Sequence, residues 1–192
     1  MRLFVAIELP EEVRRLLSRL AEPLESHGVP RSAFARPENL HITLKFLGAV
    51  EDAKLPLLTR ALQESVIGGF FELRPERIEC LPERGPVRIV SVGFGGGVNP
   101  LRALQGSIES ACSAIGFPPE GRRYRSHVTI ARLKKFLPPA ARRQLDGATV
   151  PPLPIHSFCV DHFTLVESHL GPGGSQYVPL VRFGLGGRSG DD

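Results

Sequence analysis

The sequence contains little that would tie it to a membrane or to a disulfide scaffold. It has no tryptophan, only three cysteines among 192 residues, and no apolar stretch of about 18 residues, the length a transmembrane helix requires. Cys80, Cys112 and Cys159 are odd in number and widely spaced, which argues against a disulfide framework and fits a reducing, cytoplasmic environment. We therefore expect a cytoplasmic protein without disulfides, in which each cysteine is a small buried side chain.

A strong excess of charge of either sign is also missing. The net charge is only +4, and 42% of the residues are apolar, enough to bury a sizeable core in one domain or in two small lobes. The apolar N-terminus is broken by Glu8 and lacks a small-residue cleavage site, so it predicts a first strand and not a signal peptide. Basic residues concentrate between 122 and 135, which is compatible with a phosphate-bearing partner, although composition alone favours a solvated surface.

The apolar periodicity predicts an alternation of strands and helices. Helical spacing and helix-opening residues predict helices at 13–24, 55–66, 99–115 and 138–145. Strands are expected at 2–9, 40–47, 70–80, 87–94, 124–133, 155–166 and 177–183. We expect a single domain over residues 1–184, followed by a flexible Gly-rich tail at 185–192.

The predicted elements form a weak internal repeat. Strand, helix, strand, helix, strand occurs twice, and residues 4–13 moved forward by 86 positions land on 90–99, again a strand running toward a helix start. Sequence identity between the halves is poor, so the repeat is one of pattern only. It predicts two similar lobes, each offering one strand to a shared cleft.

The chemistry-bearing feature is His-x-Thr followed by an apolar residue. It occurs at His41–Leu44 and at His127–Ile130, which are 86 residues apart. Positions i and i+2 of a strand point to the same face, so each strand should present one imidazole and one hydroxyl, those of Thr43 and Thr129, with the apolar residues packed behind. Six His and five Thr placed at random would give about 0.16 such pairs in a chain of this length.

A third copy shows that the pattern alone does not identify a site. His162–Leu165 also matches, but it lies outside the 86-residue repeat and is followed by Val166 and Glu167 instead of basic residues. We interpret His162 as structural. Two histidines in matched contexts, in contrast, suit acid–base chemistry at a phosphodiester, because imidazole titrates near neutral pH and one copy can be neutral while the other is cationic. The threonine hydroxyls can donate to phosphate oxygens, and this chemistry requires no metal.

Residues 41–48 (His-Ile-Thr-Leu-Lys-Phe-Leu-Gly) and 126–133 (Ser-His-Val-Thr-Ile-Ala-Arg-Leu) resemble the paired signatures of the 2H phosphoesterase superfamily. Within it, the chain resembles the RNA 2′,3′-cyclic phosphodiesterases, historically called 2′-5′ RNA ligases. The first strand and the segments 165–168 and 177–180 also resemble that family, so the likeness covers about residues 1–184. Ser126 is a departure, because many relatives have proline there.

The resemblance implies a bilobal α/β (α+β) fold, with two largely antiparallel sheets facing across a central cleft and helices outside. It implies that His127 is the proton acceptor for water and His41 the proton donor to the leaving O3′, which gives an RNA 2′-phosphate. It also makes Arg132 and Phe46, each five residues past its histidine, substrate contacts. An offset of five places them on the opposite strand face, so a β-bulge or the strand end is needed to bring them round.

Other interpretations remain open. At the same site a ribose hydroxyl could replace water and give 2′-5′ ligation, or the basic cluster could hold RNA ends without turnover. The 7% aromatic content, without tryptophan, makes broad base stacking less favoured. A zinc site formed by His156, Cys159 and His162 is improbable, because Cys159 would face away from both histidines on a strand. We expect a monomer that uses no cofactor or metal and no membrane, with RNA 2′,3′-cyclic phosphate ends or related nucleotides as its partners.

Overall fold

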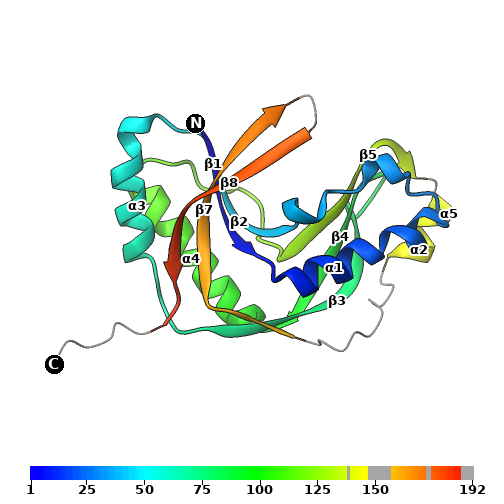
Figure 1. Ribbon diagram of the computed structural model, residues 1–192, viewed down its shortest axis with the longest axis horizontal. Helices are drawn as coiled ribbons and strands as arrows, with labels where there is room; N and C mark the ends of the chain where they lie inside the picture. Colours follow the sequence, from blue (N-terminus) through cyan, green and yellow to red (C-terminus); the bar gives the residue numbers. More distant parts are fainter. Residues whose placement is uncertain (138, 147–156, 172–173, 187–192) are drawn as a thin grey trace.

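A computed structural model spans residues 1–192, and the structure describes all of them except 138, 147–156, 172–173 and 187–192 (Figure 1). The described residues form two four-stranded antiparallel sheets with helices packed around them. This is the mixed α+β fold class that the sequence predicts. One continuous core runs between the sheets and the helices, and it contains the apolar residues of both His-x-Thr motifs.

The first sheet has the strand order β2-β1-β7-β8. Its strands are β1 (Arg2–Glu8), β2 (His41–Ala49), β7 (His162–Gly171) and β8 (Gly174–Gly184). The second sheet has the order β5-β4-β3-β6. Its strands are β3 (Phe71–Leu81), β4 (Val87–Gly96), β5 (His127–Leu137) and β6 (Phe158–Val160). The two motif-bearing strands, β2 and β5, are therefore each at the edge of a sheet.

The helices are divided between the two sheets. Figure 1 shows α3 and α4 on the side of the first sheet, and α1, α2 and α5 on the side of the second. The α-helices are α1 (Glu11–Arg19), α2 (Ala21–Glu25), α3 (Leu55–Glu64), α4 (Val98–Ala114) and α5 (Pro139–Leu145), and the short 3-10 helices are η1 (Arg31–Ala33), η2 (Pro37–Asn39) and η3 (Asp52–Lys54). Among the described residues, none of the helices is long and apolar enough to cross a membrane.

The 86-residue offset is visible in the order of the elements. β1 moved forward by 86 falls within β4, α1 falls on the start of α4, and β2 falls on β5. In both copies the first strand pairs antiparallel with the motif strand. Each half of the chain thus builds the same pair of strands, one pair in each sheet.

The strand expected at 155–166 is wrong as a single element. β6 and β7 lie in different sheets, with Asp161 between them. Phe158–Val160 pairs with β3, while His162 begins a long pairing with β8. The apolar run is continuous because both strands face buried surroundings, and periodicity does not register a change of sheet. Residues 155 and 156 lie outside the described residues.

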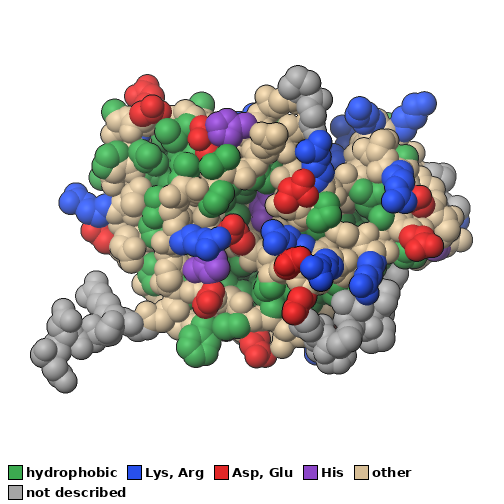
Figure 2. Space-filling view, viewed as in Figure 1, with side chains coloured by type: hydrophobic (Ala, Val, Ile, Leu, Met, Phe, Trp, Pro, Cys, Tyr) green, Lys and Arg blue, Asp and Glu red, His purple; other side chains and the backbone are tan. Residues whose placement is uncertain are grey.

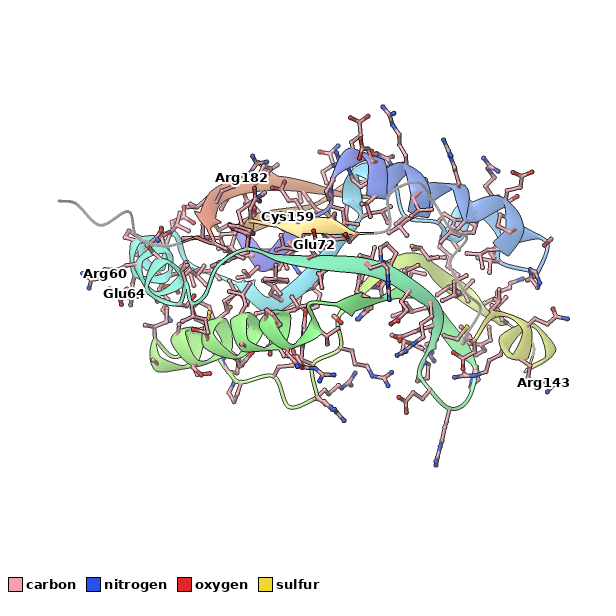
Figure 3. The ribbon with its side chains drawn as sticks, turned by 90° about the horizontal axis from the view of Figure 1, so that it is seen from below. Arg60, Glu64, Glu72, Arg143, Cys159 and Arg182 are labelled. Carbon is pink, nitrogen blue, oxygen red and sulfur yellow. The ribbon has the colours of Figure 1, made fainter. Side chains whose placement is uncertain are left out.

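The described cysteines are all free, but only two are buried. Burial raises the pKa of the Cys80 and Cys112 thiols to about 11. Cys159 is exposed, so its predicted burial is wrong. It lies on the edge strand β6 opposite Glu72 of β3, on the face away from Phe158 and Val160 (Figure 3). At the C-terminus, Leu185 is buried and its N–H donates to the Asp161 carbonyl; residues 187–192 of the expected tail lie outside the described residues.

Candidate active site

The two His-x-Thr motifs alternate as predicted from strand geometry. In β2, His41 and Thr43 are partly exposed, whereas Ile42 and Leu44 are buried. In β5, His127 and Thr129 are likewise partly exposed between buried apolar neighbours. The core therefore holds one face of each strand and leaves an imidazole and a hydroxyl on the other.

A β-bulge follows the first motif. β1 pairs Glu8 with His41 and Ala6 with Thr43, but then pairs Phe4 with Phe46, so that β2 has one residue more than its partner. The extra residue restores Phe46 to the strand face that carries the histidine. Phe46 is 66% exposed there, with its ring centroid 6.2 Å from that of Phe4.

A second bulge lies at the same place in β5. Opposite His127, Thr129 and Arg132, β4 places its alternate residues 93, 91 and 89. The residue that the pairing skips is Ile130, which corresponds to Leu44 under the 86-residue offset. The bulge required to bring Phe46 and Arg132 to the histidine face is thus present in both strands. We call the surface formed by His41, Thr43, Phe46, His127, Thr129 and Arg132 the two-motif surface.

Both imidazoles are oriented by the same backbone contact. Nδ1 of His41 lies 2.7 Å from the Asn39 carbonyl oxygen, and Nδ1 of His127 lies 3.0 Å from the Arg125 carbonyl oxygen. A carbonyl only accepts, so each Nδ1 carries the proton and donates it. Each Nε2 is thereby left as an acceptor, and in His41 it lies 3.1 Å from the Thr43 hydroxyl.

The environment of His41 includes the charge of His127. Residues of β2 and β5 approach within 8 Å between Cα atoms. Burial lowers the pKa of the His41 imidazole below its usual 6.5; the Asn39 carbonyl opposes this shift, and the charge of His127 adds to it. His127 therefore lies near enough to influence His41, although their motifs are 86 residues apart.

Two aromatic rings contact His41, and neither was anticipated from the sequence. The Phe4 and His41 ring centroids are 4.9 Å apart, and Tyr177 meets His41 edge-on at 5.1 Å. Phe4 lies on β1 and Tyr177 on β8, so only the pairing of the first sheet brings them together. No local pattern marks them, although both lie in segments that resemble the family.

Tyr124 links the segment that enters β5 to β2. Its hydroxyl donates to the Thr43 carbonyl at 3.2 Å, and burial raises the pKa of this phenol. On the opposite face of β2, the Lys45 ammonium is buried and contacts Glu109 of α4 at 2.6 Å and the Pro118 carbonyl at 3.0 Å. The two contacts hold β2 against both the loop before β5 and the helix behind it.

The third copy of the motif is used differently. The Thr164 hydroxyl donates to Glu8, and His162 contacts the same carboxylate at 3.4 Å and Asp161 at 2.6 Å. Arg182 also donates to Glu8, at 3.0 Å. His162 is thus one member of an ion-pair cluster, in agreement with its structural interpretation.

No group of three or more His, Cys, Asp and Glu side chains suited to a metal occurs within the part of the chain that the structure describes. His156, one of the three ligands considered from the sequence, lies outside that part. Cys159 faces away from the neighbouring positions of β6, as expected for its place on a strand.

Comparison with known proteins identifies the family. The family model described as "LigT like Phosphoesterase" matches residues 7–90 and 96–177, which include both motif strands. The chain belongs to the LigT-like phosphoesterases of the 2H superfamily. It is therefore an enzyme of the phosphoesterase class.

Similar sequences and structures agree with this assignment. The RNA 2′,3′-cyclic phosphodiesterase of Methanothermobacter thermautotrophicus is 31% identical over 96% of this chain and 98% of its own. The RNA 2′,3′-cyclic phosphodiesterase of Escherichia coli is 29% identical over 96% of each chain. The crystal structure of E. coli LigT complexed with 3′-AMP superposes with a TM-score of 0.75 at 26% identity, covering 96% of this chain and 97% of that one. These LigT-like phosphoesterases thus share the fold over nearly the whole chain.

Proposed function

We propose that this LigT-like phosphoesterase hydrolyses RNA 2′,3′-cyclic phosphodiester ends to 2′-phosphomonoesters without a metal ion. The observation that carries the proposal is the matched pair of imidazoles on the two-motif surface: each Nδ1 is held by the carbonyl two residues before it, which leaves each Nε2 as an acceptor. The names of the relatives, RNA 2′,3′-cyclic phosphodiesterases, supply the substrate class.

In the proposed reaction, His127 is the general base. With its proton fixed on Nδ1 by the Arg125 carbonyl, Nε2 has a lone pair that removes a proton from water. The water oxygen forms a bond to phosphorus as the bond between phosphorus and O3′ breaks. His127 is partly exposed, as access for water requires.

His41 is the general acid. Its protonated form donates the Nε2 proton to the departing O3′, and the Asn39 carbonyl keeps the ring oriented during the transfer. Because burial lowers the pKa of this imidazole, its protonated form is a stronger acid than an exposed imidazolium. The negative phosphate of a bound substrate favours that protonated form.

The remaining residues of the two-motif surface bind the substrate. The Thr43 hydroxyl, which contacts His41 Nε2 in the free protein, turns to the phosphate when substrate arrives, and Thr129 does the same from the other strand. The exposed ring of Phe46 offers a stacking surface for the terminal base, and the Arg132 guanidinium lies on the matching face of β5. We further expect the enzyme to be a cytoplasmic monomer, since its free thiols suit a reducing compartment.

The test uses a 2′,3′-cyclic mononucleotide in the presence of EDTA, with the product identified by phosphorus NMR. We expect a 2′-phosphate, and we expect His41→Ala and His127→Ala each to reduce kcat by about 10²–10⁴-fold with an unchanged melting temperature. Replacement of His27, which is partly exposed and lies in neither motif, provides the matched control. Full turnover by His127→Ala would overturn the assignment.

Two other experimental results would assign a different function to the enzyme. Paired RNA fragments, one with a 2′,3′-cyclic phosphate and one with a 5′-hydroxyl, report ligation: a 2′-5′ joined product in excess of hydrolysis would make the enzyme a ligase. Binding of cyclic-ended RNA without any product would make it a binding module.

A further inference from the structure

The two halves of the duplication diverge just beyond the two-motif surface. Seven and nine positions past its histidine, β5 carries Lys134 and Phe136, whereas the corresponding residues of the first half are Gly48 and Val50. Val50 is 4% exposed and belongs to the core, but Phe136 is 54% exposed. The second half therefore has an exposed cation and an exposed aromatic ring at positions where the first half has a glycine and a buried valine.

Lys134 and Phe136 lie on β5 just beyond Arg132, in a stretch where the pairing with β4 is irregular: Arg132 lies opposite Ile89, but Leu137 lies opposite Val87. Leu133 and Leu137 are buried in the core, and the three residues between them are all exposed. Arg132 lies opposite Ile89 of β4, and His127 lies opposite Gly93. Because these two β4 residues share one strand face, Arg132 and His127 do as well. The strand thus continues from the imidazole through Arg132 to an exposed lysine and then to an exposed phenylalanine.

An arginine lies against the exposed phenylalanine. The guanidinium carbon of Arg88, on the neighbouring strand β4, is 5.0 Å from the Phe136 ring centroid. A guanidinium over a ring holds the ring in one orientation and adds a flat, cationic surface of its own. The pair offers a base a stacking platform whose charge also suits phosphate.

Lys134 carries an uncompensated charge. Among the described residues no carboxylate lies within ion-pair distance of Lys134 or Arg132, whereas Arg77 and Arg125 are each paired with a glutamate. Figure 2 shows Lys and Arg side chains concentrated over the right half of the molecule, the half that contains the second sheet and α1 in Figure 1. An unpaired cation on this half is available to a phosphate.

We infer that Lys134, Phe136 and Arg88 form a subsite for nucleotides upstream of the cyclic end, so that the enzyme prefers single-stranded RNA to mononucleotides. The inference rests on the proposed function, because it extends the RNA from the same two histidines. Phe136 is nine residues beyond His127, or up to about 30 Å along an extended strand, a span of several nucleotides. Lys134 binds a backbone phosphate in between, and an upstream base stacks on the Phe136 ring.

The test compares kcat/KM for a 2′,3′-cyclic mononucleotide with that for a hexanucleotide carrying the same cyclic end. The wild type favours the hexanucleotide, and Phe136→Ala reduces that preference by about tenfold, as expected for the loss of one stacked base, while mononucleotide turnover is unchanged. Phe136→Tyr retains the ring and restores the preference. Lys134→Met weakens hexanucleotide binding and makes it less dependent on salt.

Phe70→Ala is the matched control, because Phe70 is 70% exposed and lies outside β5. It leaves the preference unchanged. Equal kcat/KM for both substrates in the wild type, or a Phe136→Ala enzyme with the wild-type preference, overturns the subsite while mononucleotide turnover still supports the proposed function. If neither substrate is turned over, the proposed function fails. Fluorescence anisotropy with a hexanucleotide ending in a 2′-phosphate then decides the subsite alone: equal affinity of the wild type and Phe136→Ala overturns it.

Discussion

Leu44 and Ile130 are the extra residues of two β-bulges, 86 positions apart in the chain, each directly after the threonine of a His-x-Thr motif. Each side chain is buried, so packing in the core holds the bulge in place. Because a bulge reverses the alternation of the residues that follow, the position five past each histidine returns to the histidine face. The bulges therefore determine which side chains can accompany the imidazoles.

The bulge in β2 predicts a binding role for Phe46. We expect Phe46→Ala to raise KM for a cyclic mononucleotide by about tenfold, since one stacking surface is lost, with a smaller effect on kcat. The melting temperature should change little because the ring is 66% exposed. Steady-state kinetics beside Phe70→Ala, another exposed phenylalanine, measures the effect. An unchanged KM would exclude base stacking at this position.

The contacts of the third His-x-Thr motif predict that His162, unlike His41 and His127, has no part in catalysis. His162→Ala should leave kcat and KM unchanged, because this imidazole contacts Glu8 and Asp161. Glu8 retains Thr164 and Arg182 as donors, so we expect a stability loss of about 1 kcal/mol or less for this partly exposed pair. Chemical denaturation and turnover of His162→Ala should be measured beside His127→Ala. A kinetic defect as large as that of His127→Ala would place His162 in the reaction.

The environment of His41 predicts its titration. Its pKa should lie below 6.5 in the folded protein, and His127→Gln should raise it, although not to 6.5, because burial is the larger cause and remains. Histidine ring NMR signals recorded from pH 4 to 9 measure both values, with His162→Ala as the control. Since the folded pKa is lowered, the unfolded chain binds the proton more readily, and this site destabilises the fold as pH falls below about 6.5. A His41 pKa above 6.5 would contradict the buried environment.

The local features of the site follow from the sequence because they depend on strand alternation. The placement of His41 and Thr43 on one face, with Ile42 and Leu44 behind them, requires only a period of two and an apolar core. The need for a bulge before Phe46 and Arg132 also follows, because an offset of five contradicts that period. The position of each bulge does not, since it depends on how many residues the partner strand supplies.

The long-range features of the site do not follow from the sequence. Tyr177 reaches His41 only because β7 pairs with β1 and β8 with β7, across most of the chain. The change of sheet at Asp161 is hidden for the same reason: both flanking strands are apolar, and only their partners distinguish them. Lys45 reads as a surface residue in a strand, yet it is buried against Glu109 of a helix that begins about fifty residues later.

We predict that the Tyr124 hydroxyl holds the two motif strands in position relative to each other. Tyr124→Phe keeps the buried ring and removes the donor to the Thr43 carbonyl, which should cost about 1 kcal/mol of stability. With β2 and the entry to β5 less firmly joined, kcat should fall while KM changes little, because the imidazoles act on the reacting atoms from both strands. The pKa of His41 should also rise, since the lowering by the charge of His127 depends on their separation.

Ser107→Ala is the control for this tie. Ser107 also donates a hydroxyl hydrogen bond to a backbone carbonyl, that of Ser65 at 2.7 Å, but it joins α4 to the end of α3. It should lose similar stability with normal kinetics and a normal His41 titration. If Tyr124→Phe behaves like Ser107→Ala, the hydroxyl stabilises the fold without positioning the histidines. A lower kcat together with a higher His41 pKa in Tyr124→Phe alone is the result that a positioning role requires, because stability loss by itself moves neither quantity.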